Sequence, residues 1–239
     1  MNYNDYEMET AFRERELEAS AALPELMRKV YVWMTLALVI TGFTAYAVAA
    51  TPNLQQLVFA NTWVLWGLII AEVGLVIAIN AAINKLSLAM ATLLFILYSV
   101  INGATLSVIF VAYSIGTISK VFFITAGTFA VMAFIGYVTK TDLSKMGKIL
   151  FMALIGIIIA TVVNIFVKSS GLDMILSYVG VLVFVGLTAY DTQKIKQMLW
   201  QAGDVSENSQ KVALLGALSL YLDFINLFLY LLRIFGRRD

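Results

Sequence analysis

The chain has 239 residues, of which 61% are hydrophobic and only 13% are charged. A water-soluble domain carries roughly 25% charged residues, so this composition excludes an ordinary soluble fold and is typical of a protein embedded in a lipid bilayer. The absence of Cys and His excludes disulfides, thiolate nucleophiles, His/Cys metal sites and imidazole catalysis. The net charge of only +1 argues against nucleic-acid binding.

The N-terminal segment is charged. Residues 1–29 contain seven acids and four bases. Charge this dense seldom encloses a core, so we expect either a solvated surface helix or a disordered tail, with binding of a partner as the alternative role. The first apolar run begins near Val30, without the basic start and cleavage pattern of a secretory signal. The sequence therefore predicts a cytoplasmic tail over residues 1–29 and a transmembrane domain over residues 30–239.

Seven apolar runs follow the tail. A helix needs about 20 apolar residues to cross a hydrocarbon core of roughly 30 Å. The runs that approach this length cover residues 30–50, 62–83, 86–113, 118–139, 146–167, 174–195 and 212–235. Breaks at 51–53, 114–116 and 169–171 predict short turns, so neighbouring helices should be antiparallel. The expected fold is an all-α integral membrane protein, a bundle of seven transmembrane helices.

The basic residues sort by loop. If the N-terminus is cytoplasmic, 11 Lys and Arg residues lie on the cytoplasmic side and 5 on the other. Because cytoplasmic loops are enriched in bases, we expect a cytoplasmic N-terminus. Arg233, Arg237 and Arg238 would then lie outside, against the rule. Six crossings or a re-entrant segment would remove this conflict.

Three acids, Glu72, Asp191 and Asp223, interrupt the apolar runs. Ionisable groups inside a bilayer are costly enough to be functional candidates. Glu72 lies near the centre of its run, where it must be protonated, paired or wetted by a cavity, and a structural hydrogen bond is the alternative. Asp191 lies one turn before Lys194 and could form an ordinary interfacial ion pair with Lys194 or Lys196.

The two aspartates are expected at similar depth. Counting along each helix puts Asp223 roughly 10 Å and Asp191 roughly 5 to 7 Å inside the cytoplasmic boundary. If the last two helices pack face to face, the carboxyl groups can meet, titrate as a coupled pair and act as a pH-sensitive latch. Polar neighbours that could orient a shared proton, or simply join helices, are Tyr190, Thr192, Tyr221 and Asn226.

Two segments, 189–195 (AYDTQKI) and 220–228 (LYLDFINLF), resemble the transmembrane Bax inhibitor motif family. The second segment is the more specific. The likeness covers nearly the whole chain after the tail, including residues 71–73 (AEV), 141–144 (TDLS) and 231–236 (LLRIFG).

This resemblance implies a seven-helix fold with the last helix at the centre, and a pair of aspartates, here Asp191 and Asp223, that senses pH and governs a calcium leak. Family members also place a base near the cytoplasmic end of helix two to bridge the aspartates. The matching position here is Ile83, and Lys85 is the nearest base, so we expect a different pH response. Two carboxylates cannot supply the six to eight oxygens that Ca²⁺ prefers. We therefore expect weak, transient binding of a transported ion and no cofactor.

Other classes of function fit less well. An intramembrane aspartyl protease also has a Tyr-Asp pair on one helix and an Asp on the next, but its second motif is Gly-x-Gly-Asp, whereas residues 220–223 read Leu-Tyr-Leu-Asp. Bulky Tyr221 would stand where a substrate must approach the backbone. A retinal protein needs a buried amine, and the last helix has no interior Lys. We expect no enzymatic activity.

An interaction protein is the main alternative to a leak channel. Bacterial relatives within the family that the chain resembles have been linked to a membrane-bound ATP-dependent protease that degrades membrane proteins. The charged tail would be the contact for such a partner. The expected location is the bacterial cytoplasmic membrane, with the lipid bilayer and Ca²⁺ as partners and the protease as a further partner under this alternative.

Overall fold

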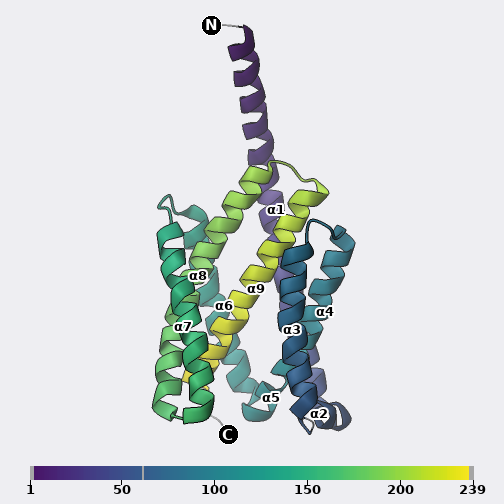
Figure 1. Cartoon of the computed structure of the whole chain (residues 1–239), viewed down its shortest axis with the longest axis vertical. Helices are drawn as coiled ribbons and strands as arrows, with labels where there is room; N and C mark the ends of the chain where they lie inside the picture. The colour runs from purple at the N-terminus through teal and green to yellow at the C-terminus, as the bar shows by residue number, and fades with distance from the viewer. Residues whose placement is uncertain (1–2, 61, 237–239) are drawn as a thin grey trace.

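The computed structural model describes residues 3–60 and 62–236, and all regular structure within them is helical (Figure 1). The helices of this part are α1 (Tyr3–Ala50), α2 (Pro52–Phe59), α3 (Thr62–Ala82), α4 (Leu88–Leu106), α5 (Val108–Ala112), α6 (Ile115–Val138), α7 (Ser144–Val167), α8 (Ser170–Ala202) and α9 (Glu207–Phe235). Within the described residues, seven spans are long and apolar enough to cross a membrane, with α4 and α5 forming one of them. The predicted all-α membrane bundle is therefore confirmed.

Successive spans alternate in direction, which gives the bundle two distinct ends (Figure 1). The N-terminal end carries the start of α1 and the α3–α4, α6–α7 and α8–α9 loops. The C-terminal end carries α2, α5, the α7–α8 turn and the end of α9. Seven crossings place Arg233 at the C-terminal end, so the predicted conflict with the distribution of bases persists. Arg237 and Arg238 lie outside the described residues.

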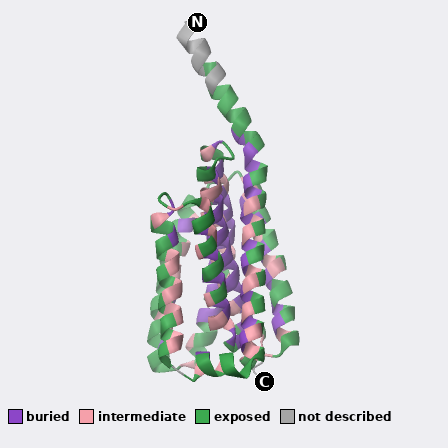
Figure 2. Cartoon of the chain, turned by 90° about the vertical axis from the view of Figure 1, so that its right-hand side faces the viewer, coloured by how far each residue is buried: buried purple, intermediate pink, exposed green. Residues whose placement is uncertain are grey.

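Helix α1 continues through the boundary expected between tail and membrane domain. It passes Pro24 without ending. Ala19, Ala22 and Leu23 are already buried against the bundle, whereas residues 12–18 are exposed. Packing on both sides of Pro24 offsets the backbone hydrogen bond that proline removes. Figure 2 shows the start of α1 standing clear of the other helices.

The predicted turns mostly mark helix starts. Ser114 accepts a hydrogen bond from the Thr117 backbone N–H and caps α6, and Ser169 accepts one from the Leu172 N–H and caps α8. Serine is a favoured N-cap because its hydroxyl satisfies an otherwise unpaired N–H group. Pro52 begins the short helix α2, which was not predicted, at the position where proline fits best.

Helix α9 is the centre of the bundle. It crosses the middle of the molecule (Figure 1) and packs against α8, α1, α6 and α4. Leu220, Tyr221 and Leu227 have no exposed surface. The central position that the family resemblance implied for the last helix is therefore confirmed.

A glycine sets the distance between α6 and α8. A Cβ atom at Gly136 would overlap the backbone of Ala189 on α8. Gly127, on the same helix, has nothing within 4 Å of such an atom. The close approach at Gly136 therefore sets the position of α8 relative to α6 at Ala189, two residues before Asp191.

We predict that Gly136→Ala lowers the free energy of unfolding by about 1 to 3 kcal/mol, the usual cost of overpacking. Gly127→Ala is the matched control and should be neutral or stabilising, since alanine favours a helix over glycine by about 1 kcal/mol. Reversible unfolding in mixed detergent micelles measures both. Equal effects of the two substitutions would contradict the close contact of α6 with α8.

Candidate functional site

Asp191 of α8 and Asp223 of α9 meet in the interior of the bundle. Their carboxyl groups lie within hydrogen-bonding reach of each other. Asp223 is only 5% exposed, and its Oδ2 atom has no hydrogen-bond partner among the described residues. Asp191 is half-buried. The juxtaposition expected from helix depth is thus present in the structure.

The register of α8 against α9 brings the aspartates together. Near the N-terminal end, the side chain of Ile195 lies against Gly216. Near the other end, the ring of Tyr230 lies against Gly180. In an antiparallel pair with these two contacts, position 191 faces position 219 or 220, because each step along one helix is matched by a step back along the other, and position 223 lies about one helical turn further along α9. The two glycine contacts therefore bring Asp191 and Asp223 to within about one turn of each other.

The two lysines considered as partners of Asp191 have different roles. Lys194 lies close enough to attract the Asp191 carboxyl group, and its ammonium lies 5.9 Å from the centre of the Tyr190 ring. Lys196 turns to α6, where it donates a hydrogen bond of 2.8 Å to the Tyr137 carbonyl. Of the two, only Lys194 contributes positive charge near the acid pair.

Helix α3 supplies no base to the aspartates. Ile83, at the position where the family pattern has a base, is a buried hydrophobic residue. Lys85 lies exposed in the α3–α4 loop. The ion pairs within the described part of the chain are Lys29–Glu25 and Lys211–Glu207, so Lys85 belongs to none of them. The aspartates therefore face each other without the bridging cation of the family pattern.

Glu72 belongs to a second polar cluster. Asn102 Nδ2 donates to Glu72 Oε2 at 3.1 Å, and the Tyr221 hydroxyl donates to Asn102 Oδ1 at 2.9 Å. The Thr41 Oγ1 atom lies 2.7 Å from the Tyr221 hydroxyl and donates to the Ser99 carbonyl at 3.0 Å. This chain of contacts joins α3, α4, α9 and α1. Glu72 Oε1 is buried without a hydrogen-bond partner among the described groups.

Tyr221 faces away from the aspartates. It was expected to support Asp223, but two residues along a helix turn by about 200°, which directs it to the opposite side of α9. Asn226 donates to the Leu222 carbonyl of its own helix, so its amide group is not directed to the acid pair either. Thr192 interacts with the Tyr31 hydroxyl of α1. Of the four polar neighbours named from the sequence, Thr192, Tyr221 and Asn226 therefore have their contacts away from the acid pair.

Asn102 and Thr41 were not singled out from the sequence because they are uncharged residues inside apolar runs. The signal that could have found Asn102 is its type, since an amide inside the hydrocarbon region often pairs with a neighbouring helix. Thr41 has no such signal, because a threonine hydroxyl can bond within its own helix.

Gln193 is a further residue that sequence reasoning did not single out. Its side chain accepts a hydrogen bond from the Leu143 N–H at 2.9 Å and donates to the Thr141 carbonyl at 2.8 Å. It thereby attaches the α6–α7 loop to α8, two residues after Asp191. A displacement of this part of α8 would either break these two hydrogen bonds or move the α6–α7 loop together with the helix.

The acids in the loops at the N-terminal end are held as carboxylates. Hydrogen bonds from Ser144 hold the pKa of Asp142 below its ordinary value. The hydroxyl groups of Ser209 and Ser206 lower the pKa of Asp204 in the same way. A carboxyl group with a lowered pKa stays ionised near neutral pH, so neither residue changes charge there.

The acid pair provides few ligands for a metal ion. Within the described ranges, no group of three or more acidic side chains comes together. A divalent cation at Asp191 and Asp223 would obtain only part of the oxygen shell that Ca²⁺ prefers. The arrangement suits brief contact with a passing ion better than storage.

Comparison with known proteins agrees with this fold. Residues 23–239 match the model of a family described as inhibitor of apoptosis-promoting Bax1. The chain is 51% identical over 224 residues to the inner membrane protein YbhL of Escherichia coli K12, covering 93% of this chain and 95% of that protein. It is 47% identical over 214 residues to an uncharacterised protein of Borreliella burgdorferi, covering 90% of this chain and 92% of that protein.

A third relative, an uncharacterised protein of Rickettsia prowazekii, is 41% identical over 218 residues and covers 90% of this chain and 91% of that protein. The resemblance inferred from the segments around Asp191 and Asp223 is therefore confirmed across almost the full length. This chain is a multi-pass membrane protein that belongs to the family of inhibitors of apoptosis-promoting Bax1.

Proposed function

We propose that the protein is a slow cation leak, preferring Ca²⁺, that is gated by the protonation of Asp191 and Asp223. The observation that carries this proposal is the contact of two carboxyl groups between the two most central helices, without a bridging base. We place the protein in the bacterial cytoplasmic membrane with its N-terminus in the cytoplasm, as the bases indicate. No catalytic step is part of this proposal.

The gate follows from electrostatics. Two carboxyl groups in contact are compatible while they share a proton. Loss of that proton leaves two like charges in a medium of low dielectric constant, where repulsion is far stronger than in water. The force acts across the α8–α9 contact and separates the helices. The enclosed position of Asp223 corresponds to the closed state.

Conduction requires weak sites. Ca²⁺ passing Asp191 and Asp223 would complete its shell with water and backbone carbonyl oxygens, and incomplete coordination lets the ion leave again. Glu72 would respond to the same movement, since Tyr221, two residues from Asp223, connects α9 to the Glu72 cluster. The proposed motion of α9 thus affects both acid sites.

We predict that Asp223→Asn removes most of the pH dependence of Ca²⁺ influx. For the wild type in liposomes loaded with a calcium dye, influx should rise from about pH 5 to 8 as the shared proton is lost. The amide cannot ionise, so like-charge repulsion is absent at every pH. Asp204→Asn, which changes an exposed loop acid, is the matched control and should keep the wild-type profile.

Influx no greater than that of empty liposomes would rule out the leak and favour the interaction protein. Influx that falls with rising pH would contradict the repulsion step.

We predict that Tyr221→Phe destabilises the protein without altering the pH profile. The variant leaves Asn102 Oδ1 buried without its donor, which costs about 1 to 3 kcal/mol. Tyr98→Phe removes a neighbouring hydroxyl outside this chain of hydrogen bonds and serves as the control. Unfolding in detergent measures stability and the liposome assay measures influx. A shifted pH profile would show that the two polar clusters titrate together.

The alternative function, modulation of a membrane-bound protease or of a stress response, is favoured by the start of α1. Residues 12–18 are exposed, carry charges at five of their seven positions and lie clear of the bundle (Figure 2). They form an accessible surface to which a soluble or membrane-bound partner can bind. Burial of Ala19 and Leu23 means that a truncation must end before them to leave the fold intact.

We predict that deletion of residues 1–17 leaves Ca²⁺ influx unchanged, because the removed part of α1 lies outside the bundle. If the alternative function also holds, the deletion changes the lifetime of membrane proteins degraded by the protease, measured by pulse-chase in cells. Charge reversal of Arg13 and Arg15 to Glu tests the same surface without shortening the helix. Unchanged lifetimes in both variants would contradict a role of this segment in proteolysis.

A further inference from the structure

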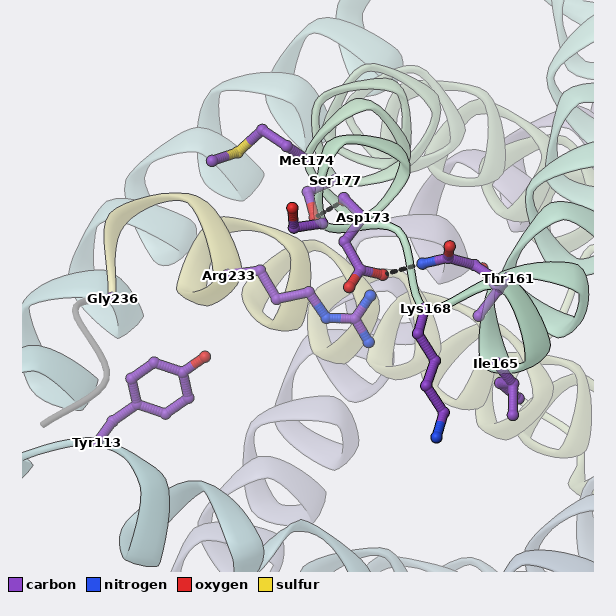
Figure 3. A pocket seen from close by; sticks show the side chains of 11 residues that line it. Tyr113, Thr161, Ile165, Lys168, Asp173, Met174, Ser177, Arg233 and Gly236 are labelled. Carbon is purple, nitrogen blue, oxygen red and sulfur yellow. Dashed lines mark hydrogen bonds between the residues drawn. The ribbon is translucent and has the colours of Figure 1, made fainter.

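A cavity of about 640 Å³, lined by both charged and apolar residues, opens at the C-terminal end of the bundle, where α7, α8 and α9 meet (Figure 3). Two bases, Lys168 and Arg233, and one acid, Asp173, line it. Arg233 is ten residues beyond Asp223 on α9, roughly 15 Å along the helix. The cavity is therefore separate from the acid pair.

Neither base at the cavity has a carboxylate within ion-pair distance in the described parts of the chain. Lys168 lies in the α7–α8 turn with a φ angle of 54°, a backbone conformation usually left to glycine. The Arg233 guanidinium lies 5.5 Å from the centre of the Tyr230 ring, which stacks on Phe184 of α8. Neither base takes part in an ion pair within 4.0 Å in the described parts of the chain. Two positive charges thus remain available to an anion.

The acid in the cavity is engaged elsewhere. Asn164 donates to Asp173 Oδ1 at 2.6 Å and accepts a hydrogen bond from the Ser169 N–H. These contacts hold the α7–α8 turn. Figure 3 shows the Arg233 guanidinium directed toward Asp173, so an internal Asp173–Arg233 attraction is the competing interpretation. The first turn of α8 adds partial positive charge to the cavity, because Ser170 lies at its N-terminus.

Lipid-facing surface surrounds the cavity. Ile165 and Met174 form part of its wall. Beside them, Phe166 of α7 is 80% exposed, and Ile175 and Tyr178 of α8 are also exposed. In a membrane-spanning bundle such side chains contact acyl chains. The cavity therefore lies where the apolar surface ends and basic groups begin, which is the geometry of a phospholipid headgroup at the interface.

We propose that this cavity binds the phosphate of an anionic phospholipid in the leaflet at the C-terminal end, with Lys168 and Arg233 contacting the headgroup and the acyl chains lying along α7 and α8. The proposal rests on the cavity and its membrane setting and does not depend on the proposed leak. It also explains why Arg233 lies at the C-terminal end of the bundle, although the distribution of Lys and Arg disfavours a base there.

The test uses full-length protein in detergent, with added phosphatidylglycerol or zwitterionic phosphatidylcholine of the same acyl chains. Native mass spectrometry and thermal unfolding should show binding and stabilisation by phosphatidylglycerol only. Lys168→Gln with Arg233→Gln should weaken this binding by about tenfold or more, since each base contributes roughly fivefold near an anionic surface. Lys120→Gln, which removes an exposed charge at the same end but outside the cavity, should bind as the wild type does.

Three further measurements distinguish an anionic lipid from a free anion or an internal ion pair. Asp173→Asn should tighten binding, because it removes the repelling carboxylate, whereas weaker binding would overturn the proposal. Unfolding of each variant without lipid reports whether it is folded. Equal stabilisation by phosphatidylcholine, by inorganic phosphate or by glycerol phosphate would overturn the assignment to an anionic lipid, as would a loss in Lys120→Gln equal to that in the double variant.

Discussion

The packing of α9 against α8 is the contact on which the rest of the structure depends. Small residues on both helices, Gly180 and Gly216, accept Tyr230 and Ile195 from the opposite helix and fix a single antiparallel register. Within that register two acidic side chains must share one enclosed space. An apolar pair at the same positions would pack at lower cost, since buried charge is expensive in a bilayer. The sequence thus keeps an unfavourable contact at the centre of its most buried interface.

The opposite side of α9 is held by hydrogen bonds to the neighbouring helices. Tyr221, Asn102 and Glu72 satisfy most of one another's hydrogen-bonding groups, so this side ties α9 to α1, α3 and α4. The acid pair is held by fewer partners. Helix α9 therefore has one side with several interhelical hydrogen bonds and one side, facing α8, with few. Movement of α9 away from α4 would break the Tyr221–Asn102 hydrogen bond, whereas the movement away from α8 that we propose would break fewer contacts of this kind.

The sequence predicted the architecture because each run of apolar residues has the length of a bilayer. It also placed Asp191 near Asp223, since depth along a helix follows from counting residues. It could not assign Tyr221 to its cluster, because rotation about the helix axis depends on which neighbour packs against which side. The continuation of α1 through Pro24 was missed for a related reason, as contacts at Ala19 and Leu23 with the bundle outweigh the local preference of proline. Gln193 and Thr41 act on distant backbone groups that no local pattern indicates.

The unbroken course of α1 has a mechanical consequence. With 48 residues it is roughly 70 Å long, and the exposed beginning and the membrane-crossing part form one rod. Because Ala19 and Leu23 already pack against the bundle, a sideways force on the exposed end would bend α1 most readily at Pro24, where a backbone hydrogen bond is missing. Thr41, on the buried part of that rod, touches Tyr221 on α9. A displacement of α1 that passed this point would reach the central helix through the Thr41–Tyr221 contact.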